Sequence, residues 1–285
     1  MIRNRLLGAA ALVFLAAGCA APPQEVSKTV LAAAPEPTKE VTHLVLPFDR
    51  YQLSVNDIYL IESAKDHLTR DCMKKRGYDW EVIDHRKQYP DVRNRRRYGV
   101  IEMQVAQEMG YKSNARLLGS TDVTARKMDR EARLDPKAQK AALDPADGCY
   151  KLAGDQLERG NEENEDLVNK LNVNSLDEAL KSPRVAPGMR SWVRCMAAKG
   201  HAYKDFYIAS EDPRWAKSKT PSRAERETAV ADVTCKQKAD LVKALSETEQ
   251  SIQEKDIREH KAYFARLEAA KERHLAAARA VLARD

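Results

Sequence analysis

The sequence contains few residues that interrupt helices and few aromatic residues. Glycine and proline contribute only 11 and 12 of the 285 residues, and aromatic residues make up 6%. Strands favour aromatic and β-branched residues, whereas alanine, glutamate, lysine, arginine and leucine, which are plentiful here, favour helices. The composition therefore predicts an all-α protein. A chain of this length can form one or two domains with a sizeable core.

The common motifs of enzymes and cofactor-binding proteins are missing as well. There is no H-E-x-x-H, G-x-S-x-G or S-x-x-K sequence, and no Walker or dinucleotide-binding motif. The six histidines are scattered, so the sequence predicts no metal site and no cofactor. Catalytic residues stay unknown, and a non-enzymatic role is favoured over an enzyme. The chain has 49 basic and 43 acidic residues. This small excess of positive charge does not indicate nucleic-acid binding.

Long apolar runs are absent except at the N-terminus. Leu6–Ala17, preceded by Arg3 and Arg5, is a run of 12 apolar or small residues, whereas a membrane-spanning helix needs about 20. The run ends in Leu-Ala-Ala-Gly-Cys19, which resembles a bacterial lipobox. Residues 1–18 are therefore predicted to be a lipoprotein signal peptide, and Cys19 the lipidated residue. The alternative is ordinary secretory cleavage near Ala21 with an incidental Cys19.

Residues 19–44 follow as a tether between the anchor and the folded part. They contain four prolines and no periodic apolar pattern, which is typical of a stiff, extended and disordered linker. Two acyl chains on Cys19 would hold the protein stably at a membrane. The expected location is the extracytoplasmic face of the cell membrane, with membrane lipid as a partner through the acyl anchor.

A short motif occurs twice and organises the rest of the chain. Cys72-Met73-x-x-x-Gly77 returns as Cys195-Met196-x-x-x-Gly200, 123 residues later. In both copies we expect the glycine to end a helix in the left-handed conformation. The repeat predicts a first helical unit over 45–160, a polar linker over 161–174, and a second helical unit over 175–285.

No glycine or proline interrupts the chain from Arg223 to Asp285. This predicts a long C-terminal helix. It either continues unbroken, as a projecting arm or coiled-coil partner that could support an oligomer, or breaks near Ser246 and folds back on its own domain. The sequence leaves these alternatives open.

Four cysteines remain once Cys19 is assigned to lipid: Cys72, Cys149, Cys195 and Cys235. Their wide spacing does not fit a zinc or redox motif, and an even number in an oxidising compartment favours two disulfides. Three pairings are compatible with four cysteines, and the repeat favours Cys72–Cys149 with Cys195–Cys235. The expected fold is thus all-α, with two disulfide-stapled helical units and a long C-terminal helix.

A cluster of arginines follows the first copy of the motif: Arg93, Arg95, Arg96 and Arg97. It has two interpretations. The cluster either contacts an anion such as a phospholipid headgroup, or forms a solvated basic loop.

Seven fragments occur in a characteristic order along the chain: Leu46-Pro47-Phe48-Asp49, Cys72-Met73-x-x-x-Gly77-Tyr78, Tyr98-Gly99, Gly110-Tyr111, Ser182-Pro183-Arg184-Val185, Trp192-x-x-Cys195-Met196 and Ala229-x-Ala231-Asp232-Val233-x-Cys235-Lys236. Together they resemble a family of uncharacterised exported lipoproteins of actinobacteria. The resemblance covers most of the chain after the signal peptide, and it implies an envelope location without implying an activity or catalytic residues. Two departures, Ser182 in place of an aspartate and Pro187 in the next helix, leave the start of that helix open.

The favoured functional hypothesis is a non-enzymatic envelope lipoprotein that binds a protein or a cell-wall component through its helical surface. Two alternatives belong to other classes. One is a cell-wall hydrolase with a carboxylate site that the sequence does not reveal, and the other is a module that senses a small ligand or signal. A deep pocket with converging carboxylates would favour the hydrolase, whereas an exposed apolar stripe over residues 241–267 would favour a partner helix.

Overall fold

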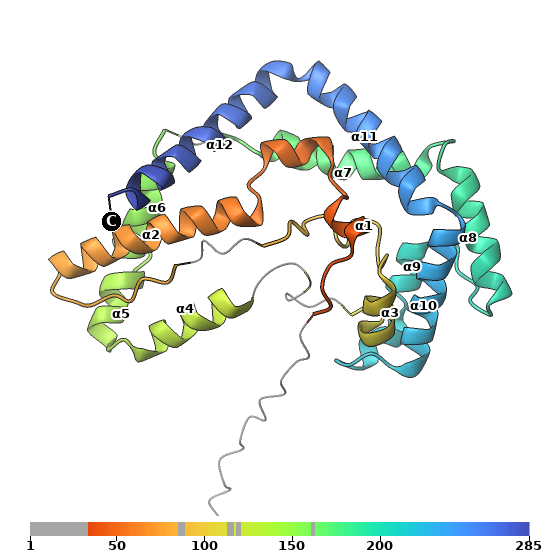
Figure 1. Cartoon of the computed structure of the whole chain (residues 1–285), viewed down its shortest axis with the longest axis horizontal. Helices are drawn as coiled ribbons and strands as arrows, with labels where there is room; N and C mark the ends of the chain where they lie inside the picture. Colours follow the sequence, from red (N-terminus) through yellow and green to blue (C-terminus); the bar gives the residue numbers. More distant parts are fainter. Residues whose placement is uncertain (1–33, 85–88, 113–116, 118–120, 161–162, 285) are drawn as a thin grey trace, which may run out of the picture. The chain divides into compact units, whose positions relative to one another are not determined.

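The computed structural model describes residues 34–84, 89–112, 117, 121–160 and 163–284. The predicted signal peptide and Cys19 lie outside these residues. Throughout the described part of the chain the regular structure is helical and contains no strand, which confirms the all-α prediction (Figure 1). The elements are α1 (Lys39–Thr42), η1 (Pro47–Tyr51), α2 (Val55–Lys75), α3 (Met103–Met109), α4 (Thr121–Arg133), α5 (Pro136–Leu143), α6 (Cys149–Glu158), α7 (Asp166–Lys181), α8 (Ala186–Ala198), α9 (Phe206–Ser210), η3 (Pro213–Lys217), α10 (Arg223–Lys238), α11 (Leu241–Glu259) and α12 (Lys261–Leu282).

The repeated Cys-Met-x-x-x-Gly motif forms the same helix end in both copies. Gly77 follows α2 with φ 83°, and Gly200 follows α8 with φ 85°, a conformation that glycine adopts without a Cβ penalty. The residue after each glycine donates its N–H to the carbonyl of the motif's methionine, at 3.0 Å for Met73 and 2.9 Å for Met196. This is a Schellman motif, so the predicted helix stops are confirmed.

Both disulfides join the cysteine of this motif to a later helix. Cys72 at the end of α2 is bonded to Cys149 at the start of α6, and Cys195 in α8 is bonded to Cys235 in α10. The Cα atoms are 5.6 Å apart in both bonds. The structure thus contains the pairing that the repeat predicts.

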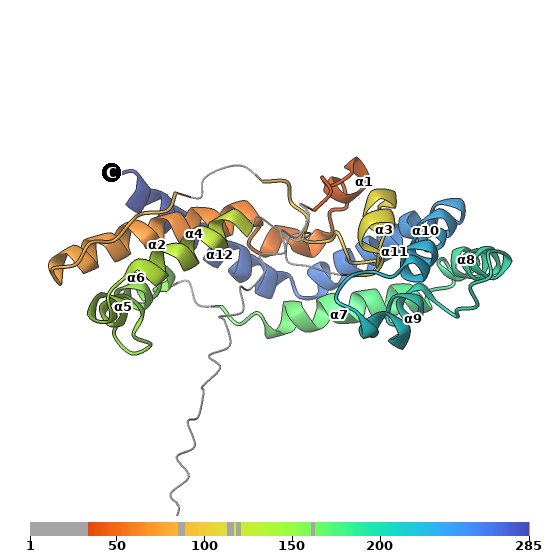
Figure 2. The ribbon, with the colours of Figure 1, turned by 90° about the horizontal axis from the view of Figure 1, so that it is seen from below.

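The C-terminal stretch is divided into three helices. The first break lies at Asp240, which has φ 48°, and the second at His260, where α11 meets α12. After the breaks, α11 packs on α7 and α12 packs on α2 (Figures 1 and 2). The unbroken arm is therefore wrong, and the alternative in which the stretch folds back on its own domain is confirmed, although the breaks lie at Asp240 and His260 and not near Ser246. The long C-terminal helix exists as α12, with 22 residues.

Apolar residues of this C-terminal stretch pack in the hydrophobic cores of the molecule. Leu241 and Leu245 belong to the main core with Trp192, and Phe264 and Leu267 pack in a second cluster with Phe48. In that cluster the rings of Phe48 and Phe264 stack with centroids 5.2 Å apart. The stripe that would have favoured a partner helix is therefore covered by the chain itself.

The boundaries of the expected tether and linker need correction. Val41, placed in the tether, is only 1% exposed and belongs to the main core. Residues 166–174, placed in the linker, form the first half of α7. Pro187 lies in the first turn of α8 and does not interrupt it, because a proline is tolerated where the N–H has no helical partner. The chain from Ala34 onward forms one compact unit in which residues from both repeats share cores.

Candidate binding groove

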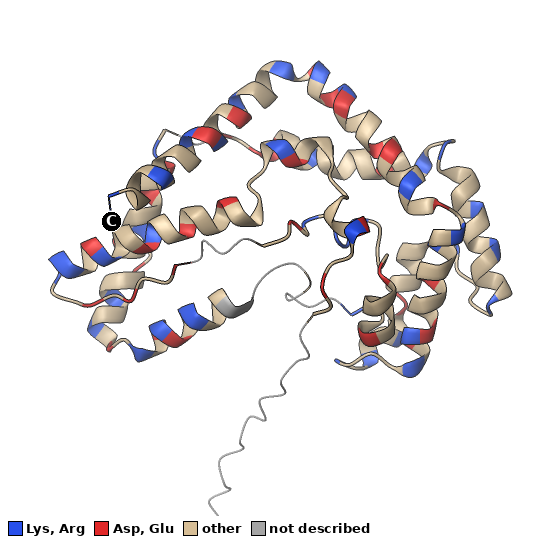
Figure 3. Ribbon diagram, viewed as in Figure 1, with Lys and Arg blue, Asp and Glu red and all other residues tan. Residues whose placement is uncertain are grey.

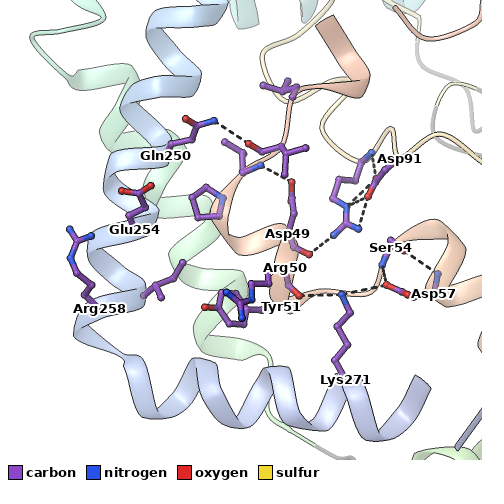
Figure 4. A pocket seen from close by; sticks show the side chains of 16 residues that line it. Asp49, Arg50, Tyr51, Ser54, Asp57, Asp91, Gln250, Glu254, Arg258 and Lys271 are labelled. Carbon is purple, nitrogen blue, oxygen red and sulfur yellow. Dashed lines mark hydrogen bonds and ion pairs between the residues drawn. The ribbon is translucent and has the colours of Figure 1, made fainter. Parts of the chain in front are cut away.

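An open groove of about 830 Å³ lies between the segment that leads into α2 and the last two helices (Figure 4). Residues 44–57 form one wall, Asp91 and Arg93 close one end, and α11 with α12 forms the other wall. The two helices diverge at His260, and the η1 segment occupies the angle between them, because Phe48 and Tyr51 pack on Phe264. The break at His260 therefore shapes the groove.

The lysine in this groove is used to hold the wall in place. Lys271 Nζ donates to the backbone carbonyls of Arg50, at 3.1 Å, and of Gln52, at 2.9 Å, and lies 3.4 Å from the carboxylate of Asp57. Since an ammonium group has three donors, these contacts occupy all of them. Lys271 thus attaches α12 to the segment before α2 and has no proton-transfer partner other than Asp57.

The carboxylates of the groove are likewise bound to nearby groups. Asp49 accepts hydrogen bonds from the Leu46 N–H at 2.8 Å and from Asn94 Nδ2 at 2.7 Å. Burial raises the pKa of Asp49 in spite of these bonds. The pKa of Asp57 is lowered. Burial acts to raise this pKa, but hydrogen bonds from Ser54 and the charge of Lys271 together outweigh the effect of burial.

The hydroxyl of the groove has a structural role too. Ser54 accepts from the Asp57 N–H at 3.1 Å, and Asp57 accepts from the Ser54 N–H at 2.8 Å, which is the capping box of α2. Asp57 also binds the Ser54 side chain, whereas Asp49 binds Leu46 and Asn94, so the two acids stabilise separate parts of the wall. Ser54 and Asp57 together stabilise the start of α2.

The remaining surface of the groove is suited to binding. Val45 is 59% exposed, and Pro47 and Ile257 add further apolar lining. Glu254 and Arg258, one turn apart on α11, form no ion pair with each other or with another described residue (Figure 4). An apolar strip with one free charge of each sign fits a partner that has an apolar side chain flanked by polar groups.

Two of the clustered arginines between residues 93 and 97 point into the molecule. Arg95 is only 3% exposed and forms an ion pair of 2.6 Å with Glu102. Arg97 forms an ion pair with Glu249, whose side chain is fully buried. Both guanidinium groups therefore have partners inside the molecule. The run of arginines in the sequence did not reveal these partners.

The other two are also occupied. Arg96 Nη2 donates to the Tyr111 carbonyl at 3.0 Å, and Arg93 forms an ion pair of 2.7 Å with Asp91 at the end of the groove. The proposed anion contact at Arg93, Arg95, Arg96 and Arg97 is therefore corrected, and so is the solvated loop: the cluster joins separate parts of the fold. Arg95 and Arg97, which have buried partners of opposite charge, are not available for an external anion.

A further buried ion pair, between Lys236 and Asp232, was not recognised in the sequence. Lys236 is 1% exposed, and its Nζ donates to Asp232 at 3.0 Å and to the Val100 carbonyl at 2.9 Å. Trp192 Nε1 donates to the other oxygen of Asp232 at 2.8 Å. Burial lowers the pKa of Lys236 and raises the pKa of Asp232, and in both cases the partner's charge opposes the shift. The pair lies beside the second disulfide and organises the core.

The described residues contain no group of three or more metal-ligating side chains, and none of their helices is long and apolar enough to cross a membrane. No protein-family model, curated protein or solved structure matches this chain. The two disulfides indicate an oxidising, extracytoplasmic compartment. The groove and the compartment are therefore the two features that bear on the function.

Proposed function

We propose that this protein is a lipoprotein, anchored through Cys19 at the outer face of the cell membrane, that binds an envelope protein or a cell-wall component without catalysing a reaction. The groove beside η1 carries this proposal. Its lysine, its aspartates and its serine are bonded within the wall, while Val45, Glu254 and Arg258 remain available to a partner. Among the partner classes, a protein segment fits best, because apolar contact and both signs of charge occur together in the groove.

Replacing the exposed groove residue Val45 by aspartate is expected to reduce partner binding at least tenfold, because the charge would be desolvated against an apolar partner surface. The measurement is in-cell crosslinking of the membrane fraction followed by mass spectrometry, with crosslinks mapped onto residues 44–57 and 250–271. Val173→Asp is the matched control, since Val173 is 63% exposed on α7, away from the groove. Equal crosslinking in both variants would refute the groove as the binding site, and muralytic activity of the purified protein would refute a non-enzymatic role.

Replacing Cys19 by alanine is expected to release the protein from the membrane fraction, because both acyl chains are lost and the described helices offer no membrane span. Immunoblots of separated fractions, with intact-mass measurement of the wild-type protein, test this. A wild-type mass without acyl chains would contradict the anchor, even if the groove result held.

A further inference from the structure

One segment of the chain carries positive charge only. Acidic residues make up 43 of the 285 residues, yet none occurs between residues 181 and 204. This segment comprises the last residue of α7, the loop to α8, α8 itself and the loop after it. Its basic residues are Lys181, Arg184, Arg190, Arg194, Lys199 and Lys204.

All six of these side chains are exposed, and α8 shows how the sequence places them. Trp192 and Met196 are completely buried on one face of the helix, whereas Arg190 and Arg194, one turn apart, lie on the exposed face. Figure 3 shows basic positions and no acidic one along α8. Because the buried face is fixed by the core and by the bond from Cys195 to α10, the exposed face is held rigidly.

None of the six forms an ion pair or a side-chain hydrogen bond with another described residue. Other exposed lysines do have acidic partners, as Lys243 has Glu247 and Lys255 has Glu259 on α11. The six basic side chains around α8 therefore have no direct partner of opposite charge among the described residues. Charges distributed along 24 residues suit an extended anionic surface better than one small anion.

We propose that the exposed face of α8, together with its flanking loops, contacts the anionic phospholipid headgroups of the membrane. The choice of a membrane rests on the proposed anchor, because Ala34 is 15 positions after Cys19 and this stretch can span at most about 50 Å. Each lysine or arginine close to an anionic bilayer contributes about 1 kcal/mol. The contact would orient the anchored protein, so that α8 faces the bilayer.

The test is co-sedimentation of the full chain carrying Cys19→Ala with two kinds of vesicle, an equal mixture of phosphatidylglycerol and phosphatidylcholine, and phosphatidylcholine alone. We expect tighter binding to the mixed vesicles, weakened by salt. Binding to the neutral vesicles measures any contribution of the apolar N-terminal run. Arg190→Glu with Arg194→Glu should weaken the charge-dependent binding by about thirtyfold, which corresponds to about 2 kcal/mol.

The matched control is Lys137→Glu with Lys140→Glu, because both lysines are exposed on α5 among residues of mixed charge. This variant should bind like the parent chain, and thermal melting should show that both variants are folded. Equal binding by the α8 variant, an equal loss in the control, or no preference for phosphatidylglycerol would overturn the proposal. Binding to an isolated anionic wall polymer but not to vesicles would show that the α8 surface binds the polymer and not the membrane. Since the assayed chain has no acyl anchor, such failures leave the lipidation of Cys19 and the groove untouched.

Discussion

Replacement of Lys236 by methionine is expected to lower the free energy of unfolding by about 3–5 kcal/mol. The substitution removes the ammonium group that pairs with Asp232, while Trp192 still donates to the carboxylate, and Asp232 is completely buried. It also removes the donor to the Val100 carbonyl. An unpaired buried charge costs far more than a lost surface contact. Urea denaturation of the oxidised protein, followed by circular dichroism, measures the change.

Lys243→Met provides the control for this substitution, since Lys243 makes the same lysine-to-carboxylate i,i+4 contact on an exposed face of α11. It should change the free energy of unfolding by less than about 1 kcal/mol. The double variant Asp232→Leu/Lys236→Met should recover part of the loss, because no charge remains buried. If Lys236→Met were no worse than Lys243→Met, the buried ion pair would be disproved.

Removal of the second disulfide, with Cys195→Ala and Cys235→Ala together, is expected to lower the free energy of unfolding by about 4 kcal/mol. The bond closes a loop of 40 residues and so limits the unfolded chain. Cys72→Ala with Cys149→Ala, which opens a loop of 77 residues, should cost slightly more. Denaturation curves of the two variants and the wild-type protein, under non-reducing conditions, give the comparison.

Peptide mapping without reduction checks the pairing behind this expectation. It should recover Cys72 joined to Cys149, and Cys195 joined to Cys235. A peptide joining Cys72 to Cys195 would contradict the structure. In the denaturation experiment, wild-type protein treated with reductant serves as the reference. Its free energy of unfolding should fall by the combined contribution of both disulfides.

Features encoded by neighbouring residues could be predicted from the sequence. The capping residues Ser54 and Ser222 lie at the starts of α2 and α10, and Gly77 and Gly200 follow the ends of α2 and α8. Each depends on contacts within a few residues, so the signal is local. The disulfide pairing could be predicted because the repeat supplied a second copy for comparison.

Features that depend on distant partners could not be predicted. Arg97 is inside because Glu249, 152 residues away, pairs with it. Ile58 on α2 is apolar but 45% exposed, because the partner helices cover the face that carries Ile61 and Ala64. Asp240 breaks the C-terminal stretch with a left-handed conformation that residues other than glycine seldom adopt, so no sequence signal marked it.

The groove was missed for a similar reason. Its walls come from residues 44–57, 91–93 and 250–271, and only the folded chain brings these segments together. In the sequence alone, Val45 is an ordinary apolar residue at the start of the predicted first unit, and Arg258 is an ordinary residue of a solvated helix. What makes them a candidate site is the position of α12, which is set by Lys271 and by the packing of Phe264.

The packing of α12 on α2 also bears on how the protein reaches its native state. Lys271 bonds to a carbonyl 219 residues earlier, so α2, with 21 residues, finds its partner only after α12 has been synthesised. Contacts between residues so far apart slow folding, because a long loop must close before they form. The apolar face of α2 would meanwhile be exposed to other chains. A chaperone that shields this face until α12 arrives would raise the yield of native protein.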